Sequence, residues 1–345
     1  MLFKGKVNRV RRLFMHSLTR TIGQKDDMIG MNNPDIVNVL ICRPNSRLGN
    51  QLLITPVIQD ISNYFPNCKI DLFVRGNAAF AIFKNYRNVD RVIKLPQKPF
   101  RNIIKYLYVW CGLRQKNYDL VINIDHGSSS GKLATKLSKS KRKIFGVMND
   151  ELCAICSDYI HMAKAPVYNL RKSLGIDLPI NTTIPTLDIK LDSGEKKQGE
   201  ELLFNIVKNN KATICIYTYA TGMKCYPIEW WVRLYGMLKE RYEQNYNIIE
   251  ILPKENISQI NFKAPPFYSM NLREIAALIA NTTLFIGADS GMMHLASSSG
   301  TPTIGLFSVS NMDRYQPYGK RNVGINTNDK SFEDILDIID ISLTS

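Results

Sequence analysis

From residue 36 onward, short apolar runs rich in β-branched residues alternate with stretches that carry apolar residues at helical spacing. Turn residues bound each run, a pattern typical of strands in a parallel sheet whose two faces are covered by helices. The alternation therefore predicts an α/β fold built of doubly wound parallel sheets, with a clear first helix over 51–64. The predicted strands span 36–42, 69–74, 91–95 and 119–124 in the first half, and 212–217, 247–252, 283–287 and 303–307 in the second.

The two halves of the chain have the same predicted pattern, and the stretch between them, 179–192, is rich in Pro, Thr and Asp without periodicity. A length of 345 residues suits about two domains. We therefore expect two Rossmann-like domains that face each other across a cleft. The predicted divisions are a basic N-terminal segment at 1–35, a first domain at 36–185, a second domain at 186–330 and a closing amphipathic helix at 331–345.

Lys and Arg outnumber Asp and Glu by 45 to 30, and the formal net charge of +15 favours anionic partners. Nucleic acid, anionic lipid and phosphorylated small molecules all satisfy this charge, but no recognition motif supports nucleic acid, and we expect none as a partner. Basic residues gather at 1–20 and at 132–143. Residues 1–20 can form a helix with one apolar side, which would suit an anionic membrane surface; a basic tail or a helix docked on the domain are the alternatives.

We expect a cytoplasmic protein, with any membrane contact at the cytoplasmic face of the inner membrane. The N-terminal residues lack the apolar centre of a secretory signal, and no stretch approaches the roughly 20 apolar residues needed to cross a bilayer. Seven cysteines without repeated spacing favour a reducing compartment.

The first candidate loop, RPNSRLGNQLLITP at 43–56, follows the first predicted strand. Gly49 permits close approach of a backbone or ligand, and a helix that starts here offers free N–H groups to an anion. The loop matches neither the GxGxxG nor the Walker A pattern. Taken alone, it is better explained as an ordinary turn between strand and helix.

The second candidate loop, TYATGMKCYPIEWW at 218–231, also follows a predicted strand. Pro227 suits the first turn of a helix, and Lys224 would project just ahead of that turn. A lysine beside a helix N-terminus can hold phosphate as a point charge. A solvated surface lysine is the alternative.

The third and most specific segment is IGADSGMMHLASSSGTPTIGLF at 286–307. A strand ends at Asp289, Ser290 and Gly291 open a helix, and His294 lies in its first turns. The N–H groups at this helix start can bind a diphosphate, and Asp289 can accept hydrogen bonds from sugar hydroxyls. A buried structural role is the alternative for His294.

In this order, these segments resemble the heptosyltransferase family, glycosyltransferase family 9, which builds lipopolysaccharide cores and related envelope glycans. The resemblance implies a GT-B fold, in which the first domain binds the acceptor and the second binds the nucleotide-sugar donor. It further implies a metal-independent, inverting transfer, with ADP-heptose as the usual donor, an anionic glycolipid or polysaccharide as acceptor, and no cofactor. The matching segments are 47–58, 118–125, 221–231, 269–307 and 317–319.

The resemblance also assigns donor-binding positions in the second half. Lys224 falls on the lysine that contacts donor phosphate, and Asp289 on the aspartate that holds the donor sugar. Met270 occupies a position near the adenine, and Glu255 is a loosely spaced candidate for the ribose. The full donor set is Thr218, Thr221, Lys224, Glu255, Met270, Asp289, Ser290, Gly291 and His294.

One departure from the family lies in the first loop, where Arg47, Gly49 and Gln51 are the candidate acceptor-side residues. The family usually has Gly-Asp, with the aspartate as general base, whereas this chain has Gly49-Asn50. An amide can orient a hydroxyl but cannot take its proton. Asp125 and His126, after the fourth predicted strand, are the candidate replacements.

The leading interpretation is a glycosyltransferase that adds a heptose-like sugar to an envelope glycan. Because Asn50 stands where the usual base would be, a non-catalytic protein that binds sugar nucleotides is an alternative. A nucleotide-sugar epimerase or hydrolase of the same fold is another, and it would consume the donor without an acceptor.

Overall fold

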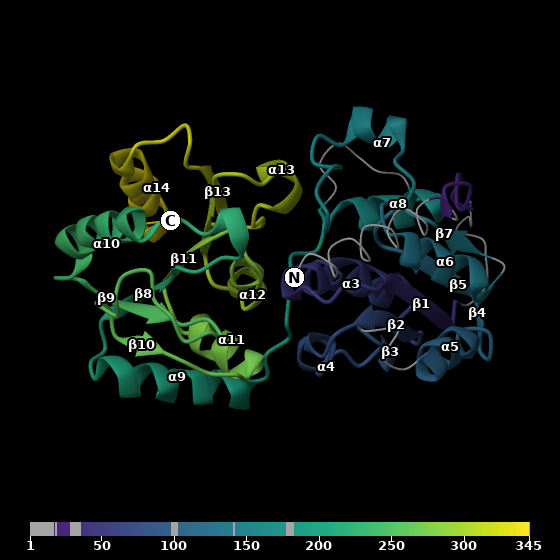
Figure 1. Ribbon diagram of the computed structural model, residues 1–345, viewed down its shortest axis with the longest axis horizontal. Coiled ribbons are helices and arrows are strands. Elements are labelled where there is room, and N and C mark those ends of the chain that lie inside the picture. Colours follow the sequence, from purple (N-terminus) through teal and green to yellow (C-terminus); the bar gives the residue numbers. More distant parts are fainter. Residues whose placement is uncertain are drawn as a thin grey trace. The chain divides into compact units, whose positions relative to one another are not determined.

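The computed structural model describes residues 17, 19–27, 36–97, 103–140, 142–176 and 183–344. The described residues form two compact units (Figure 1). The first unit takes its residues from Met1–Ser46, Pro56–Phe80 and Tyr86–Pro185, and the second from Arg47–Thr55, Ala81–Asn85 and Thr186–Ser345.

The first unit contains a five-stranded parallel sheet in the order β3-β2-β1-β5-β7. The chain enters the sheet at β1, continues through β2 to the edge strand β3, and then crosses to β5 and β7 on the other side. The strands are β1 (Asn38–Arg43), β2 (Lys69–Arg75), β3 (Val89–Leu95), β5 (Leu120–Asn123) and β7 (Lys143–Ile144), with a separate short pair of β4 (Asn117–Tyr118) and β6 (Lys139–Ser140). The helices between them are α3 (Thr55–Tyr64), α4 (Ala78–Ile82), α5 (Ile103–Gly112), α6 (Ser129–Leu137), α7 (Asp150–Ile155) and α8 (Ala165–Ser173).

The second unit repeats this topology in a six-stranded parallel sheet of order β10-β9-β8-β11-β12-β13. Its strands are β8 (Ala212–Tyr217), β9 (Tyr246–Ile251), β10 (Pro266–Phe267), β11 (Leu284–Ala288), β12 (Thr303–Phe307) and β13 (Val323–Asn326). Its helices are α2 (Leu48–Leu52), α9 (Ser193–Val207), α10 (Ile228–Tyr242), α11 (Leu272–Ala280), α12 (Gly291–Ser298), α13 (Met312–Tyr315) and α14 (Phe332–Thr344). The apolar core between the sheet and helices α10 and α14 includes the fully buried Trp231.

The predicted fold class is confirmed, and all eight predicted strands are present. The single helix predicted over 51–64 is wrong, because the chain forms two helices there, α2 and α3. Pro56 has no N–H to continue a hydrogen-bonded helix, and the Thr55 hydroxyl donates to the Leu52 carbonyl at 2.8 Å. The predicted closing helix is α14, whose inner face packs in the core of the second unit.

Part of the basic N-terminal segment packs on the first unit. Asp26 accepts hydrogen bonds from the N–H groups of Phe145 and Val147, at 2.6 and 3.3 Å, and Asp27 accepts from the N–H of Lys143 at 2.8 Å. Most of the helix predicted over 1–20 lies outside the described residues. Among the described residues, no helix is both long enough and apolar enough to cross a bilayer.

A buried arginine joins several segments of the second unit. The Arg273 guanidinium on α11 pairs with the Glu195 carboxylate at the start of α9, with two N–O distances of 2.5 Å. It also donates to the carbonyls of Ala81, Ile189 and Lys190, at 2.8, 3.1 and 2.9 Å. Through the Ala81 carbonyl, the Arg273 guanidinium therefore attaches the short segment Ala81–Asn85 to the rest of the second unit.

This ion pair makes the stability of the second unit depend on pH. Arg273 lowers the pKa of Glu195 from 4.5 to about 2. A depressed carboxylate pKa contributes stability that is complete above 4.5 and is lost as the pH falls towards about 2. We expect Glu195→Gln to lower the free energy of unfolding by about 2 kcal/mol at neutral pH, and by progressively less below 4.5. Urea unfolding, followed by tryptophan fluorescence, to which Trp230 and Trp231 of the second unit contribute, measures both effects.

The matched control is Glu201→Gln, which removes an exposed carboxylate from the same helix and should change stability by less than about 0.5 kcal/mol. A constant difference between Glu195→Gln and the unsubstituted protein at every pH would contradict this account of the ion pair.

Candidate functional site

Both sheets have a topological switch point, where the chain leaves neighbouring strands in opposite directions. In the second sheet this point lies between β8 and β11, because β9 and β10 follow β8 on one side and β12 and β13 follow β11 on the other. Doubly wound folds bind ligands there, outside the carboxyl ends of the strands. The loops that start at Thr218 and Asp289 are therefore the first place to look for a site.

The start of helix α12 follows directly after β11. The N–H of Asp289 donates to the Leu306 carbonyl at 2.9 Å, which continues the pairing with β12. Ser290 is the N-cap residue, and its hydroxyl accepts a hydrogen bond from the N–H of Met293 at 3.4 Å. Helix α12 begins at Gly291, and the N–H groups and dipole of its first turn favour an anion.

Lys224 and Asp289 form an ion pair at this switch point. Lys224 lies on the short 3-10 turn Gly222–Lys224 after β8, and its side chain is 35% exposed, whereas that of Asp289 is 6% exposed. The Lys224 ammonium also lies 5.8 Å from the centre of the Tyr315 ring. A partly accessible cation is thus held beside the start of α12. Tyr315 was not predicted, and no motif in the sequence marks it.

A buried carboxylate organises the loops after β8 and β9. Glu250 on β9 accepts hydrogen bonds from the hydroxyls of Thr218 and Ser258, both at 2.6 Å, and the Thr218 hydroxyl accepts from the N–H of Gln259 at 3.1 Å. Burial raises the pKa of Glu250 above its ordinary value. Thr218 is itself buried, so its hydroxyl stabilises the loops through these hydrogen bonds and is not exposed to a ligand in solution. Glu250 was not predicted, although it is the lone acidic residue in the apolar run NIIEIL.

Three other predicted donor residues are exposed. Thr221 directly precedes the turn that carries Lys224, Glu255 lies in the loop after β9, and Met270 lies just before α11 with a 70% exposed side chain. Among the described residues, no hydrogen bond or ion pair joins Glu255 or Met270 to the pair of Lys224 and Asp289.

Helix α2 packs against α12 within the second unit, although it follows β1 in the chain. A Cβ atom on Gly49 would lie 2.5 Å from Cδ2 of the buried His294, and one on Gly291 would lie 2.9 Å from Cβ of Leu48. Glycine is therefore required on both sides of this contact. The packing brings Asn50, which is partly exposed on α2, into the same unit as the candidate donor residues.

The neighbours of Asn50 in the first loop differ in exposure. Arg47 is exposed ahead of α2, whereas Gly49 and Gln51 are buried. Among these candidate acceptor-side residues, only Arg47 presents its side chain to solvent, and the burial of Gln51 is consistent with a structural role.

Asp125 and His126 lie at the switch point of the first sheet, just after β5. Asp125 pairs with the buried guanidinium of Arg43 and accepts a hydrogen bond from the N–H of Gly127 at 3.0 Å. His126 Nε2 lies 3.2 Å from Nζ of Lys132. Burial and, secondly, the charge of Lys132 lower the pKa of His126 below 6.5, which favours a neutral imidazole at neutral pH.

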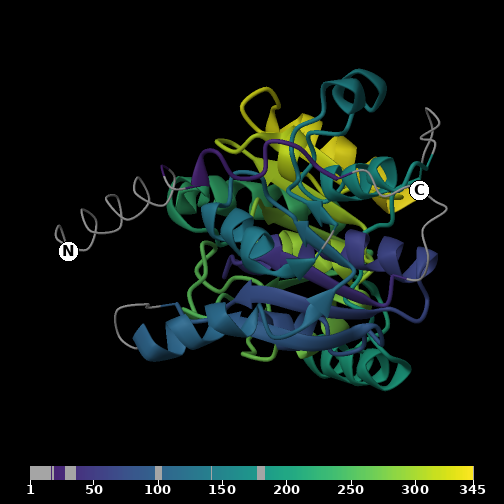
Figure 2. The ribbon, with the colours of Figure 1, turned by 90° about the vertical axis from the view of Figure 1, so that its right-hand side faces the viewer.

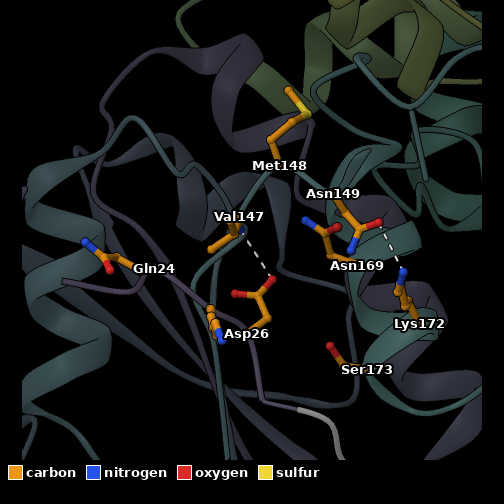
Figure 3. A pocket seen from close by; sticks show the side chains of 9 residues that line it. Gln24, Asp26, Val147, Met148, Asn149, Asn169, Lys172 and Ser173 are labelled. Atoms are coloured by element: carbon orange, nitrogen blue, oxygen red, sulfur yellow. Dashed lines mark hydrogen bonds between the residues drawn. The ribbon is translucent and has the colours of Figure 1, made fainter. Parts of the chain in front are cut away.

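The first unit also contains a cavity of about 280 Å³ that no motif predicted (Figure 3). It lies beyond the carboxyl end of β7, and burial raises the pKa of Asp26, in its wall, to about 6. Its lining residues are Gln24, Lys25, Asp26, Val147, Met148, Asn149, Asn169, Lys172 and Ser173. None of the predicted site residues lines this cavity.

The glycine contact between α2 and α12 yields a direct test. We expect Gly49→Ala to lower the free energy of unfolding by about 1–3 kcal/mol, because its methyl group would overlap the His294 ring. Gly236→Ala is the matched control on α10, since a Cβ atom there meets nothing within 4 Å. It should stabilise the protein by about 0.5–1 kcal/mol, and thermal unfolding compares the two. Equal stability of the two variants would show that the contact is looser than described.

Comparisons with known proteins agree with this architecture. Lipopolysaccharide heptosyltransferase 3 of Escherichia coli K12 is 24% identical over 292 residues, which cover 78% of this chain and 82% of that protein. A family 9 glycosyl transferase from Veillonella parvula superposes with a TM-score of 0.71 at 17% identity, covering 92% of this chain and 99% of its own. Escherichia coli heptosyltransferase WaaC with ADP gives a TM-score of 0.66 at 19% identity, covering 89% and 100%.

The chain also matches the family described as Glycosyltransferase family 9 (heptosyltransferase) over residues 107–334, which is more than half of its length. The match includes the loop of Lys224, the start of α12 and the first-unit residues after β5. The structural neighbours have the GT-B fold that the two parallel-sheet units predict. The chain therefore belongs to glycosyltransferase family 9, the heptosyltransferases.

Proposed function

We propose that this protein transfers heptose from ADP-heptose to a lipopolysaccharide or related envelope-glycan acceptor, without a metal ion and with inversion at the anomeric carbon. The observation that carries the proposal is the pair of Lys224 and Asp289 beside the start of α12, at the switch point of the second sheet. Solved structures of Escherichia coli heptosyltransferase WaaC, a protein of the same fold, contain ADP and ADP-2-deoxy-2-fluoro heptose. The second unit would bind the donor and the first unit the acceptor.

The proposed donor site would stabilise the negative charge of the departing diphosphate. Departure of ADP places negative charge on the diphosphate, and the N–H groups at the start of α12 together with the Lys224 ammonium would stabilise that charge. In the structure Lys224 pairs with Asp289, so diphosphate binding would exchange one anionic partner of the ammonium for another. Asp289 would then be free to accept hydrogen bonds from hydroxyls of the sugar.

Deprotonation of the acceptor hydroxyl needs a base, and Asn50 cannot supply one. We assign this role to His126 rather than Asp125. Nζ of Lys132 lies 3.2 Å from Nε2 of His126, so Lys132 would have to move aside for this nitrogen to take a proton. The lowered pKa of His126 favours the neutral imidazole that can take a proton, whereas Arg43 and the N–H of Gly127 engage both oxygens of Asp125. Asn50 would orient the acceptor hydroxyl.

We also propose that the protein acts in the cytoplasm. Its seven cysteines have no repeated spacing, which favours a reducing compartment.

The donor site is tested by measuring the release of ADP from ADP-heptose in the presence of a lipopolysaccharide-core acceptor. We expect Lys224→Ala to lower kcat/KM by about 100-fold or more, because a charged contact to the leaving group is lost. Asp289→Ala should also lose turnover. Addition of a chelator should leave the rate unchanged. The matched controls, Lys239→Ala and Asp337→Ala, remove exposed charges from other helices of the second unit and should retain activity.

The dependence of ADP release on the acceptor and on Lys224 distinguishes the possible reactions and also tests the site. Release of ADP that needs the acceptor and disappears in Lys224→Ala supports transfer. Release without any acceptor would indicate a hydrolase, and donor binding without turnover would indicate a sugar-nucleotide-binding protein. Full activity of a well-folded Lys224→Ala variant would refute the proposed donor site.

The assignment of the base predicts a pH profile. The rate should fall as the pH falls through a value below 6.5, where His126 becomes protonated. His126→Gln should abolish turnover while calorimetry still shows donor binding, and Asn50→Asp in that background should restore part of the rate by returning a carboxylate to the first loop. Unchanged turnover in His126→Gln would exclude this base, and loss of turnover in Asp125→Asn alone would transfer the role to Asp125.

A further inference from the structure

Helix α5 of the first unit is apolar on two opposite sides. Its inner side carries Tyr106, Val109 and Trp110, which pack in a core with the strands of the first sheet. The Trp110 ring lies edge-on to Phe73 of β2, with ring centres 5.4 Å apart. The inner side alone therefore accounts for the attachment of α5 to its unit.

The outer side of α5 presents large apolar side chains to solvent. Its contiguous exposed residues are Ile103, Ile104, Leu107 and Tyr108, at 55%, 84%, 56% and 69% exposure. Their spacing places them on one side of the helix, together with the exposed Cys111. We call these five residues the outer face of α5. Both ribbon views show the helix at the margin of the first unit (Figures 1 and 2).

Two other long helices of the described chain each carry a single exposed large apolar side chain. Phe204 on α9 and Ile341 on α14 are 52% and 65% exposed, and each stands alone on its helix. Single exposed apolar residues are common and need no explanation, but a contiguous apolar patch marks an interaction surface. The outer face of α5 is such a patch.

The charge around the outer face identifies its partner. Residues 103–118, which include α5, contain three Lys and Arg and no Asp or Glu. One of the three, Lys116, pairs with Asp71 and Asp90. Lys105 on α5 and Arg114 just after it are exposed. A helix with exposed large apolar residues and flanking basic ones matches the composition of helices that lie in the interface of an anionic bilayer.

We propose that the outer face of α5 docks on an anionic lipid membrane, with Ile104 and Leu107 entering the boundary between headgroups and acyl chains. Lys105 and Arg114 then contact the lipid phosphates. This surface differs from the helix predicted over 1–20, which lies largely outside the described residues. The proposal rests on the geometry of α5 and holds whichever sugar or acceptor the enzyme uses.

The test is flotation of the full-length protein with lipid vesicles. We expect binding to vesicles of equal parts phosphatidylglycerol and phosphatidylcholine, and little binding to pure phosphatidylcholine. Ile104→Glu combined with Leu107→Glu should weaken the binding by about tenfold or more, because two apolar side chains no longer enter the lipid. Lys105→Ala combined with Arg114→Ala should weaken it by about tenfold and reduce its dependence on salt.

The matched control is Phe204→Glu combined with Ile341→Glu, which makes the same kind of change on isolated apolar residues of α9 and α14 and should bind vesicles as the unsubstituted protein does. Circular dichroism and ADP release with a water-soluble acceptor should be unchanged in the α5 variants, which separates this proposal from the proposed transfer reaction. Vesicle binding that survives Ile104→Glu with Leu107→Glu would overturn the proposal. A dimer by light scattering that the same substitutions convert to a monomer would also overturn it, and would assign the face to a second copy of the chain.

Discussion

In each sheet the chain starts in an inner strand and later returns to the other side of that strand. This order separates the connections that leave β8 from those that leave β11, and it opens the carboxyl edge of the sheet between them. Everything proposed for the donor follows from that constraint. It brings the turn of Lys224 next to Asp289 and places both at the N-terminus of α12, where backbone N–H groups already favour an anion.

The contact between α2 and α12 gives the first loop a role that its place in the chain does not suggest. The loop follows β1 of the first sheet, yet Gly49 packs on His294 and Gly291 packs on Leu48 in the second unit. The conformational freedom of these glycines matters less than their lack of a side chain, which lets two helices approach closely. His294, whose sequence motif suggested a ligand contact, is thereby also part of the packing that positions Asn50.

The sequence predicted the strands well where apolar runs are long, and β8 and β12 have the bounds expected for them. Five short strands of two to four residues escaped prediction because so few residues carry no periodic pattern: β4, β6, β7, β10 and β13. The break between α2 and α3 was missed, although Pro56 lies within the predicted helix. Proline is tolerated in the first turn of a helix, and Pro56 therefore marks the start of a second helix, α3, and not the interior of one long helix. The pair of Lys224 and Asp289 was predictable from motifs. Its neighbour Tyr315 was not, because only the tertiary fold brings α13 to the loop after β8.

Hydrogen–deuterium exchange with and without ADP tests the central claim most directly, because it reports where the diphosphate binds without requiring turnover. A site at the switch point of the second sheet predicts slower exchange on addition of ADP in peptides that cover 218–227 and 288–295, and no change in peptides that cover β2 and β3. Lys224→Ala should remove most of that protection. Protection confined to the first unit, or protection that persists unchanged in Lys224→Ala, would contradict the account.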